Sequence, residues 1–531
     1  MRENNLAKLP IGISDFGKIR REGYLYIDKT GYIYRMLSTG MYYFLSRPRR
    51  FGKSLLLSTL YYLFKGKREL FDGLYIYHKE GIDWREYPVI MLDFNRIEST
   101  NSEILRERLI NRLKEIGQEE GLLIEESRYL KDAFAELIEK LYRKYGREVV
   151  LLIDEYDKAI VDHVGRGEEE LQVAKANRDL LRSFYGTLKA ADVVMRTKFV
   201  LLTGITKFSK VSLFSELNNL LDITMNSEFN SLLGITEQEV EAYLMPHIKA
   251  FSQEKGMSYE ALREALRDYY NGYRFSQRQE RVYNPFSLFS ALRNRSITNY
   301  WFETGTPSYL VNLIKERNIY IPEYEEFEAD EFMFSSYDIE SLQILPLMFQ
   351  SGYLTIKDYD ERTRLYTLSY PNREVKESFA RSLFREITGL YRETKYAKIG
   401  KALDDGDIEE AVELAKSIFA EIPYVLERKD RTGEEYYQTV FYLILTASGV
   451  GVRTEVLNYR GRIDMVVETR RRFYIIEFKC DQSSEAAIAQ IKEKGYAEAY
   501  RGKGKEVWLV GINFGKEKRN VTEWKAEKFY P

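Results

Sequence analysis

The sequence is poor in the side chains that build disulfide frameworks and zinc clusters. It has one cysteine and three histidines in 531 residues. One cysteine excludes an internal disulfide framework and a cysteine-rich zinc module. Three histidines leave little room for a histidine-built metal site or a histidine-based catalytic triad. With 11 prolines and 33 glycines, the chain is also not a low-complexity sequence.

Long hydrophobic runs and a large net charge are also missing. No apolar run approaches the roughly 18–20 residues that span a bilayer, and the first residues contain no apolar signal core. We therefore expect a cytoplasmic protein without a membrane partner. The 80 basic and 82 acidic residues nearly cancel, which excludes a uniformly basic nucleic-acid coat and an acidic disordered protein. A hydrophobic content of 44% is ample for a buried core.

The first 240 residues alternate short apolar runs with helical patterns. Such runs indicate strands that are buried on both faces, which is typical of a parallel α/β sheet. The expected strands of this sheet are Tyr42–Ser46, Pro88–Phe94, Val149–Ile153 and Phe199–Thr203. A helix is expected after the first strand, at Ser54–Phe64.

The rest of the chain divides into a helical part and a second α/β module. Residues 236–424 read mostly as helices, and from about 425 a helix at Glu434–Ala447 precedes several strands and a helix at Ser484–Tyr500. This last part has 20 basic and 16 acidic side chains, a weak indication of a polyanion-binding module. The length suggests about three or four domains. The expected boundaries are 1–235 for a nucleotide-binding core, 236–310 for a helical lid, 311–424 for a mainly helical middle region and 425–531 for the C-terminal domain.

A phosphate-binding loop is indicated between the first strand and its helix. Gly52-Lys53-Ser54 matches the closing half of such a loop, in which the lysine reaches the β- and γ-phosphates and the serine hydroxyl binds Mg²⁺. The usual opening glycine is absent, because Arg47 stands in its place. Taken alone, this tripeptide is more often a chance match. The residues expected to hold the nucleotide are Arg47, Arg50, Phe51, Gly52, Lys53, Ser54 and Leu55.

A second nucleotide motif follows the third expected strand. Asp154 and Glu155 come directly after the apolar run, so Asp154 would hold Mg²⁺ and Glu155 would polarise the attacking water. The two motifs have the order and spacing of an ATP site, and together they predict ATP and Mg²⁺ binding. Thr203, at the tip of the fourth strand, is a candidate γ-phosphate sensor. Arg196 and Arg274 are candidate charge-stabilising fingers, although each is more readily explained as an ordinary surface arginine.

A metal-dependent nuclease site is indicated near the C-terminus. Asp464 lies 13 residues before Glu477, and Glu477 and Lys479 alternate on one strand, so both point to the same face. Two carboxylates suit Mg²⁺ or Mn²⁺, and Lys479 would position water or stabilise charge. Taken alone, this triplet is more often a charged edge of a β-hairpin, and the polar turn and β-rich strands around it are what favour a site. Glu434 on the preceding helix is a candidate for a further carboxylate.

At this point the chain resembles the bacterial and archaeal AAA-ATPase-like proteins that are fused to a PD-(D/E)XK nuclease-superfamily domain. The matching stretches are YIDKT (26–30), RPRRFGKSLLLSTL (47–60), LLIDEYDKAI (151–160), LLTGITKFSKVSLFSELNNL (201–220), NGYRF (271–275), VYNPFSL (282–288), YWFETGTPSYL (300–310), GRIDMVVE (461–468), YIIEFK (474–479), QIKEKGY (490–496) and VGINF (510–514). The resemblance covers nearly the whole chain, and only about 320–424 is thinly matched.

The resemblance implies a P-loop ATPase with an extra catalytic glutamate, a helical lid and a restriction-endonuclease-like C-terminal domain. Lys53, Ser54, Asp154 and Glu155 inherit the nucleotide roles, and the Asp464, Glu477 and Lys479 set inherits the nuclease role. An arginine at the position of Arg47 is ordinary in that family. Gln438 stands where relatives often have a histidine.

The function expected from the sequence is that of an ATP-binding and ATP-hydrolysing protein with a nuclease domain, in defence or repair, in which ATP regulates cleavage. The alternative is a nucleotide-dependent switch whose C-terminal domain binds nucleic acid or protein without cleavage. A scaffold that binds nucleotide without hydrolysis is a further alternative, which Glu155 argues against. The sequence leaves open whether the nucleic acid is DNA or RNA, and whether the chain forms oligomers.

Overall fold

The computed structural model describes residues 6–125, 129–207, 219–301, 310–311, 313–314, 325–334, 343–422, 434–458 and 461–530. The chain forms two compact units. The first unit contains residues 1–310 and 328–372, and the second contains residues 311–327 and 373–531. The middle region expected at 311–424 is therefore divided between the two units.

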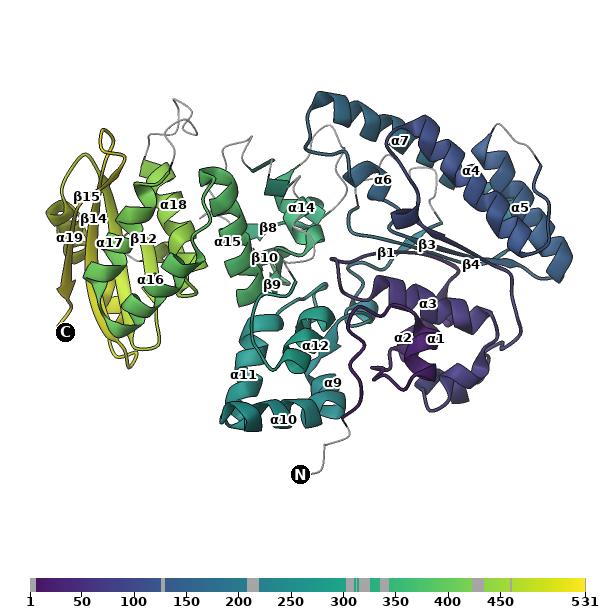
Figure 1. The fold of residues 1–531 in the computed structure, drawn as a ribbon, viewed down its shortest axis with the longest axis horizontal. Coiled ribbons are helices and arrows are strands. Elements are labelled where there is room, and N and C mark those ends of the chain that lie inside the picture. Colours follow the sequence, from purple (N-terminus) through teal and green to yellow (C-terminus); the bar gives the residue numbers. More distant parts are fainter. Residues whose placement is uncertain are drawn as a thin grey trace. The chain divides into compact units, whose positions relative to one another are not determined.

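The first unit is built on a five-stranded parallel sheet with the strand order β2-β3-β4-β1-β5 (Figure 1). Its strands are β1 (Tyr42–Ser46), β2 (Val89–Asp93), β3 (Val149–Asp154), β4 (Thr197–Gly204) and β5 (Leu221–Asp222). One face is covered by α1 (Phe16–Arg21), α2 (Thr30–Thr39) and α3 (Lys53–Phe64). The other is covered by α4 (Ser102–Glu119), α5 (Leu130–Tyr145), α6 (Lys158–Val161) and α7 (Glu168–Gly186), and α8 (Ala191–Met195) precedes β4.

The strand order determines where the functional side chains meet. Every residue of β1 and β3 is buried, as expected for central strands between two helical layers. Strand β4 pairs with β1 on one side and β3 on the other. Because all three are parallel, their carboxyl ends lie together at one edge of the sheet, which is where ligands bind in open α/β folds.

A helical subdomain follows the sheet in the same unit. It consists of α9 (Glu237–Glu239), α10 (Met245–Lys255), α11 (Tyr259–Tyr270) and α12 (Pro285–Asn294), with a short ribbon of β6 (Ile235–Thr236) and β7 (Val282–Tyr283). Its first helix starts with a capping box, in which Thr236 and Glu239 satisfy each other's backbone amides. Apolar residues of all these helices except α9 share one core.

Three short strands lie within the region that was expected to be mainly helical. They are β8 (Glu326–Ala329), β9 (Thr355–Asp360) and β10 (Leu365–Ser369), in the order β8-β10-β9, with α14 (Ile344–Ser351) before β9. These strands were not predicted from the sequence. Four described helices of this region, α14 to α17, agree with the helical expectation.

The second unit contains a five-stranded sheet in the order β11-β12-β13-β14-β15. Its strands are β11 (Gly451–Asn458), β12 (Gly461–Glu468), β13 (Arg472–Cys480), β14 (Glu506–Gly515) and β15 (Asn520–Lys528); β13 and β14 are parallel and the other pairs antiparallel. Its helices are α15 (Arg373–Thr388), α16 (Glu393–Asp405), α17 (Ile408–Phe419), α18 (Glu434–Ala447) and α19 (Ser484–Glu493). In Figure 1, α19 covers one face of the sheet, and α16, α17 and α18 cover the other.

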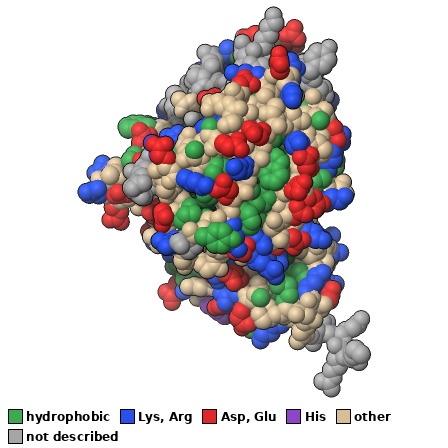
Figure 2. Space-filling view, turned by 90° about the vertical axis from the view of Figure 1, so that its left-hand side faces the viewer, with side chains coloured by type: hydrophobic (Ala, Val, Ile, Leu, Met, Phe, Trp, Pro, Cys, Tyr) green, Lys and Arg blue, Asp and Glu red, His purple; other side chains and the backbone are tan. Residues whose placement is uncertain are grey.

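The surface carries charged side chains of both signs. Figure 2 shows a face on which basic and acidic side chains are interspersed around a band of hydrophobic side chains, without a large area of one sign. In the described part of the chain, no helix is long and apolar enough to cross a membrane.

Candidate nucleotide and nuclease sites

The loop after β1 has the backbone conformation of a tight turn that leads into a helix. Arg50 and Gly52 both have positive φ angles, 67° and 99°, and α3 begins at Lys53. A Cβ at Gly52 would meet nothing within 4 Å, so glycine is favoured here by its conformation and not by space. The first amides of α3 consequently lie beside the loop, as in helix N-termini that bind phosphate.

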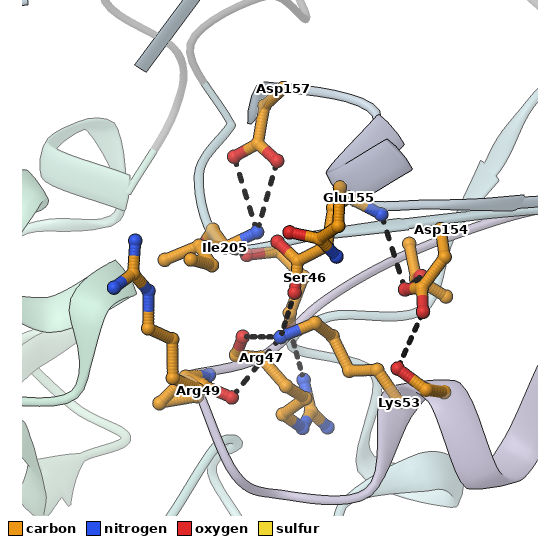
Figure 3. Close-up of polar contacts among 12 residues, drawn as sticks. Ser46, Arg47, Arg49, Lys53, Asp154, Glu155, Asp157 and Ile205 are labelled. Carbon is orange, nitrogen blue, oxygen red and sulfur yellow. Dashed lines mark hydrogen bonds and ion pairs between the residues drawn. The ribbon is translucent and has the colours of Figure 1, made fainter. Parts of the chain in front are cut away.

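Lys53 is held at this loop by backbone oxygens. Its side chain is buried, and Nζ donates hydrogen bonds to the carbonyl oxygens of Arg47 at 3.0 Å and Pro48 at 3.3 Å. The same ammonium lies 3.5 Å from Oε1 of Glu155 (Figure 3). A phosphate group that approached the loop would therefore meet an ammonium that is already positioned.

Asp154 links two other residues that were expected at the nucleotide site, Ser54 and Thr203. Its Oδ2 accepts a hydrogen bond from the Ser54 hydroxyl at 2.5 Å, and its Oδ1 accepts one from the Thr203 hydroxyl at 2.6 Å. Burial, together with the nearby charge of Glu155, raises the pKa of Asp154. A cation at this point would favour the ionised carboxylate, and Asp154 with Ser54 would supply the oxygen ligands that Mg²⁺ prefers.

Arg47, expected to contact the nucleotide, has its side chain in the interior of the unit. The guanidinium donates to the backbone oxygens of Ser46 at 2.9 Å, Thr224 at 2.6 Å and Phe229 at 3.3 Å. It also lies 4.2 Å from the centre of the Phe275 ring. Burial lowers the pKa of Arg47 to about 9. The contribution of Arg47 to the loop in this structure is its backbone oxygen, which accepts the Lys53 hydrogen bond.

A cavity of about 480 Å³ lies at the phosphate loop, where Lys53, Ser54 and Glu155 line it. It is lined by the phosphate loop, by Glu155 and by several other segments that were not assigned to the site from the sequence. The lining residues are Pro10, Ile11, Gly12, Ile13, Ser14, Arg49, Arg50, Gly52, Lys53, Ser54, Leu55, Asn95, Glu155, Asp157, Lys158, Val161, Asp162, Ile205, Pro285, Phe286 and Phe289. This volume falls in the range of small-molecule sites.

A second, apolar pocket of about 90 Å³ adjoins the cavity and shares with it Pro10, Gly52, Leu55, Pro285 and Phe289. Its other walls are mostly aliphatic side chains from residues 25–27, 55–56 and 232–235. The larger cavity has basic side chains at the phosphate loop, and the pocket beside it is apolar. Together they suit a molecule that has one negatively charged end and one flat apolar end.

Three further candidates, Phe51, Arg196 and Arg274, do not line the larger cavity. Phe51 packs edge-on against Tyr273 and Phe275. Arg196 forms a surface ion pair with Asp192 at 2.9 Å, as an ordinary arginine would. The surface interpretation was wrong for Arg274, which is 2% exposed. Its guanidinium donates to the backbone oxygen of Ser276 at 3.0 Å, in the turn that follows it, and to that of Lys357 at 3.2 Å, in β9.

In the second unit, β12 and β13 bring the predicted nuclease residues together. Met465 pairs with Ile476, so Asp464 and Glu477 are neighbours across the two strands. Oδ2 of Asp464 accepts a hydrogen bond from the Phe478 amide at 2.8 Å. Lys479 Nζ lies 3.2 Å from Oε1 of Glu477. The structure thus places the three side chains at one end of the sheet.

Glu477 has an unusual environment for a carboxylate. It is 2% exposed, and its Oε2 has no hydrogen-bond partner among the described residues. Burial, and then the charge of Asp464, raises the pKa of Glu477 to about 7. A buried carboxylate oxygen without a donor is costly, and a divalent cation beside Asp464 would satisfy it. The residues present therefore fit a metal ion of the Mg²⁺ or Mn²⁺ type.

This carboxylate pair is not a complete metal cage. Within the described ranges no three His, Cys, Asp or Glu side chains converge as a ready-made metal site. Glu434, the candidate third carboxylate, accepts a hydrogen bond from Gln438 at 3.0 Å and adds slightly to the raised pKa of Glu477. The remaining ligands of a bound cation would come from water and substrate phosphate, as is common for Mg²⁺.

Gln490 on α19 is a site residue to which the sequence analysis gave no role. Its amide donates a hydrogen bond to Oε1 of Glu477. Tyr496 stands beside it, and its hydroxyl would lie 2.9 Å from a Cβ at Gly461, where φ is 154°. The spacing of Gln490 and Tyr496 in the QIKEKGY stretch is the signal that could have identified both.

Two family models match the chain, one within each of its two compact units. A family model described as predicted AAA-ATPase matches residues 10–214, and one for the PD-(D/E)XK nuclease superfamily matches residues 432–524. A protein of Azotobacter chroococcum mcd 1, described as an uncharacterized protein in the vnfD 5' region, is 38% identical over 532 residues, which cover 98% of this chain and 99% of that protein. The ORC2 protein of Aeropyrum pernix, in its ADPNP-ADP complexes, aligns with a TM-score of 0.27 and 15% identity over 70% of this chain and 92% of that one.

Fold, sites and family matches together define an ATPase-like protein with a nuclease-like domain. The chain belongs to the family of AAA-ATPase-like proteins that carry a PD-(D/E)XK nuclease-superfamily domain.

Proposed function

We propose that this protein binds and hydrolyses ATP in the first unit and cleaves nucleic-acid phosphodiesters in the second. The observation that carries the ATPase part is the meeting of Ser54, Asp154 and Thr203 beside a cavity of about 480 Å³. The triphosphate would lie along residues 52–54, and the adenine would enter the apolar pocket.

Each residue of this site has a role that follows from its position. Lys53 would give up its backbone carbonyl contacts to bind the β- and γ-phosphates, and Asp154 would hold Mg²⁺ with Ser54. Glu155 would then no longer be paired with Lys53, whose Nζ lies 3.5 Å from it in this structure, and would accept a hydrogen bond from the attacking water. Thr203 would report the γ-phosphate through its bond to Asp154.

The nuclease part is supported by the buried Glu477 and its neighbours. Asp464 and Glu477 would hold a divalent cation, which when bound lowers the pKa of water and neutralises charge on a scissile phosphate. Lys479 would orient the attacking water or stabilise the developing negative charge. Gln490 would fix the rotamer of Glu477. The substrate class proposed is DNA or RNA, because phosphodiesters are the substrates that suit this carboxylate–lysine set.

The test is a cleavage assay with purified protein, on plasmid, single-stranded DNA and RNA, in Mg²⁺ or Mn²⁺, with and without ATP. The control is the Asp464→Ala, Lys479→Ala double variant. Cleavage by the wild type alone supports the nuclease, and a different rate in the ATP lanes supports regulation by ATP. Unchanged cleavage kinetics in Lys53→Ala, with no response to ATP, would refute that regulation.

The second candidate function is a nucleotide-dependent switch that binds nucleic acid or protein without cleavage. The absence of a preformed three-ligand metal site in the described residues favours it. Binding of labelled DNA or RNA, without cleavage in any metal, would move the assignment to this switch. Phosphate release from ATP by the wild type, and its loss in Glu155→Gln, would separate an active ATPase from a scaffold that only binds nucleotide.

A further inference from the structure

Glu155 has a backbone conformation that its own side chain does not favour. Its φ is 53°, in the left-handed region that non-glycine residues rarely adopt. Such a conformation persists when the surrounding structure imposes it. The bonds on either side of Glu155 therefore decide where its carboxylate points.

The residue before Glu155 is anchored toward the phosphate loop. Asp154 accepts the Ser54 and Thr203 hydroxyl bonds, and its Oδ1 also accepts the Glu155 amide at 3.1 Å. These bonds fix the amino side of the Glu155 backbone.

The two residues after Glu155 are anchored to the tip of β4. Asp157 is 1% exposed, and its Oδ2 accepts the Ile205 amide at 3.1 Å (Figure 3). The same oxygen accepts the Thr206 amide at 2.7 Å and the Thr206 hydroxyl at 2.6 Å. The Tyr156 hydroxyl donates to the Thr206 backbone oxygen at 2.6 Å. With three donors on one carboxylate, Asp157 directly links the end of β3 to residues 205–206 after β4.

This link also reaches the phosphate loop. The Arg47 amide donates to the Gly204 backbone oxygen at 3.1 Å, and the Ser46 hydroxyl donates to the Ile205 backbone oxygen. The tips of β1, β3 and β4 are thus tied together through residues 204–206. A Cβ at Gly204 would lie 2.5 Å from Oδ1 of Asp157, so the close approach of the two tips depends on glycine at that position.

We propose that Asp157 is a positioning residue for ATP hydrolysis. By tying the end of β3 to residues 205–206, it holds Glu155 in the left-handed conformation from which its carboxylate faces Lys53. Asp157 contacts neither phosphate nor water in this role; it acts through Glu155. The proposal rests on the proposed ATPase function and adds a residue outside the phosphate-loop and metal-binding motifs.

The test measures ATP hydrolysis and binding in Asp157→Asn, which keeps the size of the side chain but loses acceptor capacity. We expect kcat to fall roughly 10- to 100-fold, as misplacement of a catalytic group by about 1 Å does, with nearly unchanged affinity for a fluorescent ATP analogue. Thr206→Val, which removes only the hydroxyl bond, should show a smaller fall in the same direction. Asp192→Asn, the same change in a surface ion pair ahead of β4, should match the wild type.

Two readouts separate positioning from a general loss of structure. In a Glu155→Gln background, Asp157→Asn should cause almost no further loss of kcat, because the group that it positions is already disabled. A crystal structure of Asp157→Asn should show Glu155 outside the left-handed region. A wild-type kcat in Asp157→Asn, fully additive losses in the double variant, or an unchanged Glu155 conformation would each overturn the proposal.

The same experiments keep this proposal separate from the proposed function. The wild-type hydrolysis rate tests the ATPase, whereas the ratio of variant to wild type tests Asp157. The crystal structure reports the conformation of Glu155 whether or not ATP is hydrolysed.

Discussion

Gln490 donates a hydrogen bond to one oxygen of Glu477, while the other oxygen of that carboxylate has no hydrogen-bond partner among the described residues. The amide thus orients a carboxylate whose pKa is raised by the nearby charge of Asp464. Removing a group that orients a metal ligand in this way typically lowers metal affinity about 10- to 100-fold.

Replacing Gln490 by alanine should therefore weaken metal-dependent cleavage. We expect the Mg²⁺ concentration for half-maximal cleavage to rise about 10- to 100-fold, with partial recovery at high Mg²⁺. A titration of cleavage rate against Mg²⁺ measures this. Gln253→Ala, which removes an exposed amide of α10, is the control. An unchanged Mg²⁺ midpoint in Gln490→Ala would show that the amide does not serve the metal site.

Glu477→Gln should stabilise the metal-free protein while it abolishes cleavage. The pKa of Glu477 is about 7 in the folded protein, against an ordinary value of 4.5. Between these values the folded state binds more protons than the unfolded state, so the free energy of unfolding falls as the pH rises. At pH 8 the neutral amide avoids this loss, which is on the order of 3 kcal/mol at most.

The measurement is thermal unfolding in EDTA at pH 8 and pH 4. The variant should have the higher Tm at pH 8, and the difference should shrink at pH 4, where the carboxyl is protonated in both states. Added Mg²⁺ should raise the Tm of the wild type only. A variant that is less stable than the wild type at pH 8 would contradict the raised pKa.

Gly204→Ala should destabilise the first unit. Its Cβ would lie 2.5 Å from both Oδ1 of Asp157 and the Tyr156 ring, and overpacking of this kind typically costs about 1–3 kcal/mol. Gly31→Ala is the matched control, because the nearest atom to a Cβ there, in the Tyr75 ring, is at an ordinary contact distance of 3.5 Å. Chemical unfolding of both variants compares them directly. Equal stabilities would mean that the two strand tips separate easily.

Arg47→Lys should lower stability more than nucleotide affinity. A lysine cannot reproduce the guanidinium bonds to the oxygens of Thr224 and Phe229, and leaving buried acceptors unpaired costs roughly 1–3 kcal/mol each. Urea unfolding and ATP-analogue binding at a temperature where the variant is folded give the two quantities. A large loss of affinity with unchanged stability would return Arg47 to the role predicted from the sequence.

The elements around both sites could be predicted well because they follow local patterns. The strand Tyr42–Ser46 and the helix Glu434–Ala447 were expected with the bounds that the structure has. Apolar runs that are buried on both faces, and motifs at the ends of such runs, give a signal within a few residues of sequence. The same patterns predicted that the Asp154 and Ser54 side chains belong to one site.

What the sequence did not predict depends on contacts between distant segments. Strands β9 and β10 are short and mixed in polarity, and they were read as part of a helical region. The direction of the Arg47 side chain is set by oxygens about 180 residues away. No role was predicted for Asp157 from the sequence, because its partners at 205–206 are known only once β3 and β4 are adjacent.

The path of the chain through the two units has a consequence for how this architecture can be cut or recombined. Because residues 311–327 belong to the second unit and residues 328–372 to the first, no single break in the chain yields two intact halves. A fragment that begins near residue 425 would lack α15, α16 and α17, and would leave apolar side chains of the nuclease-like sheet in water. Exchange of one catalytic half between relatives would thus require crossovers at several points, and we expect the two halves to be inherited together.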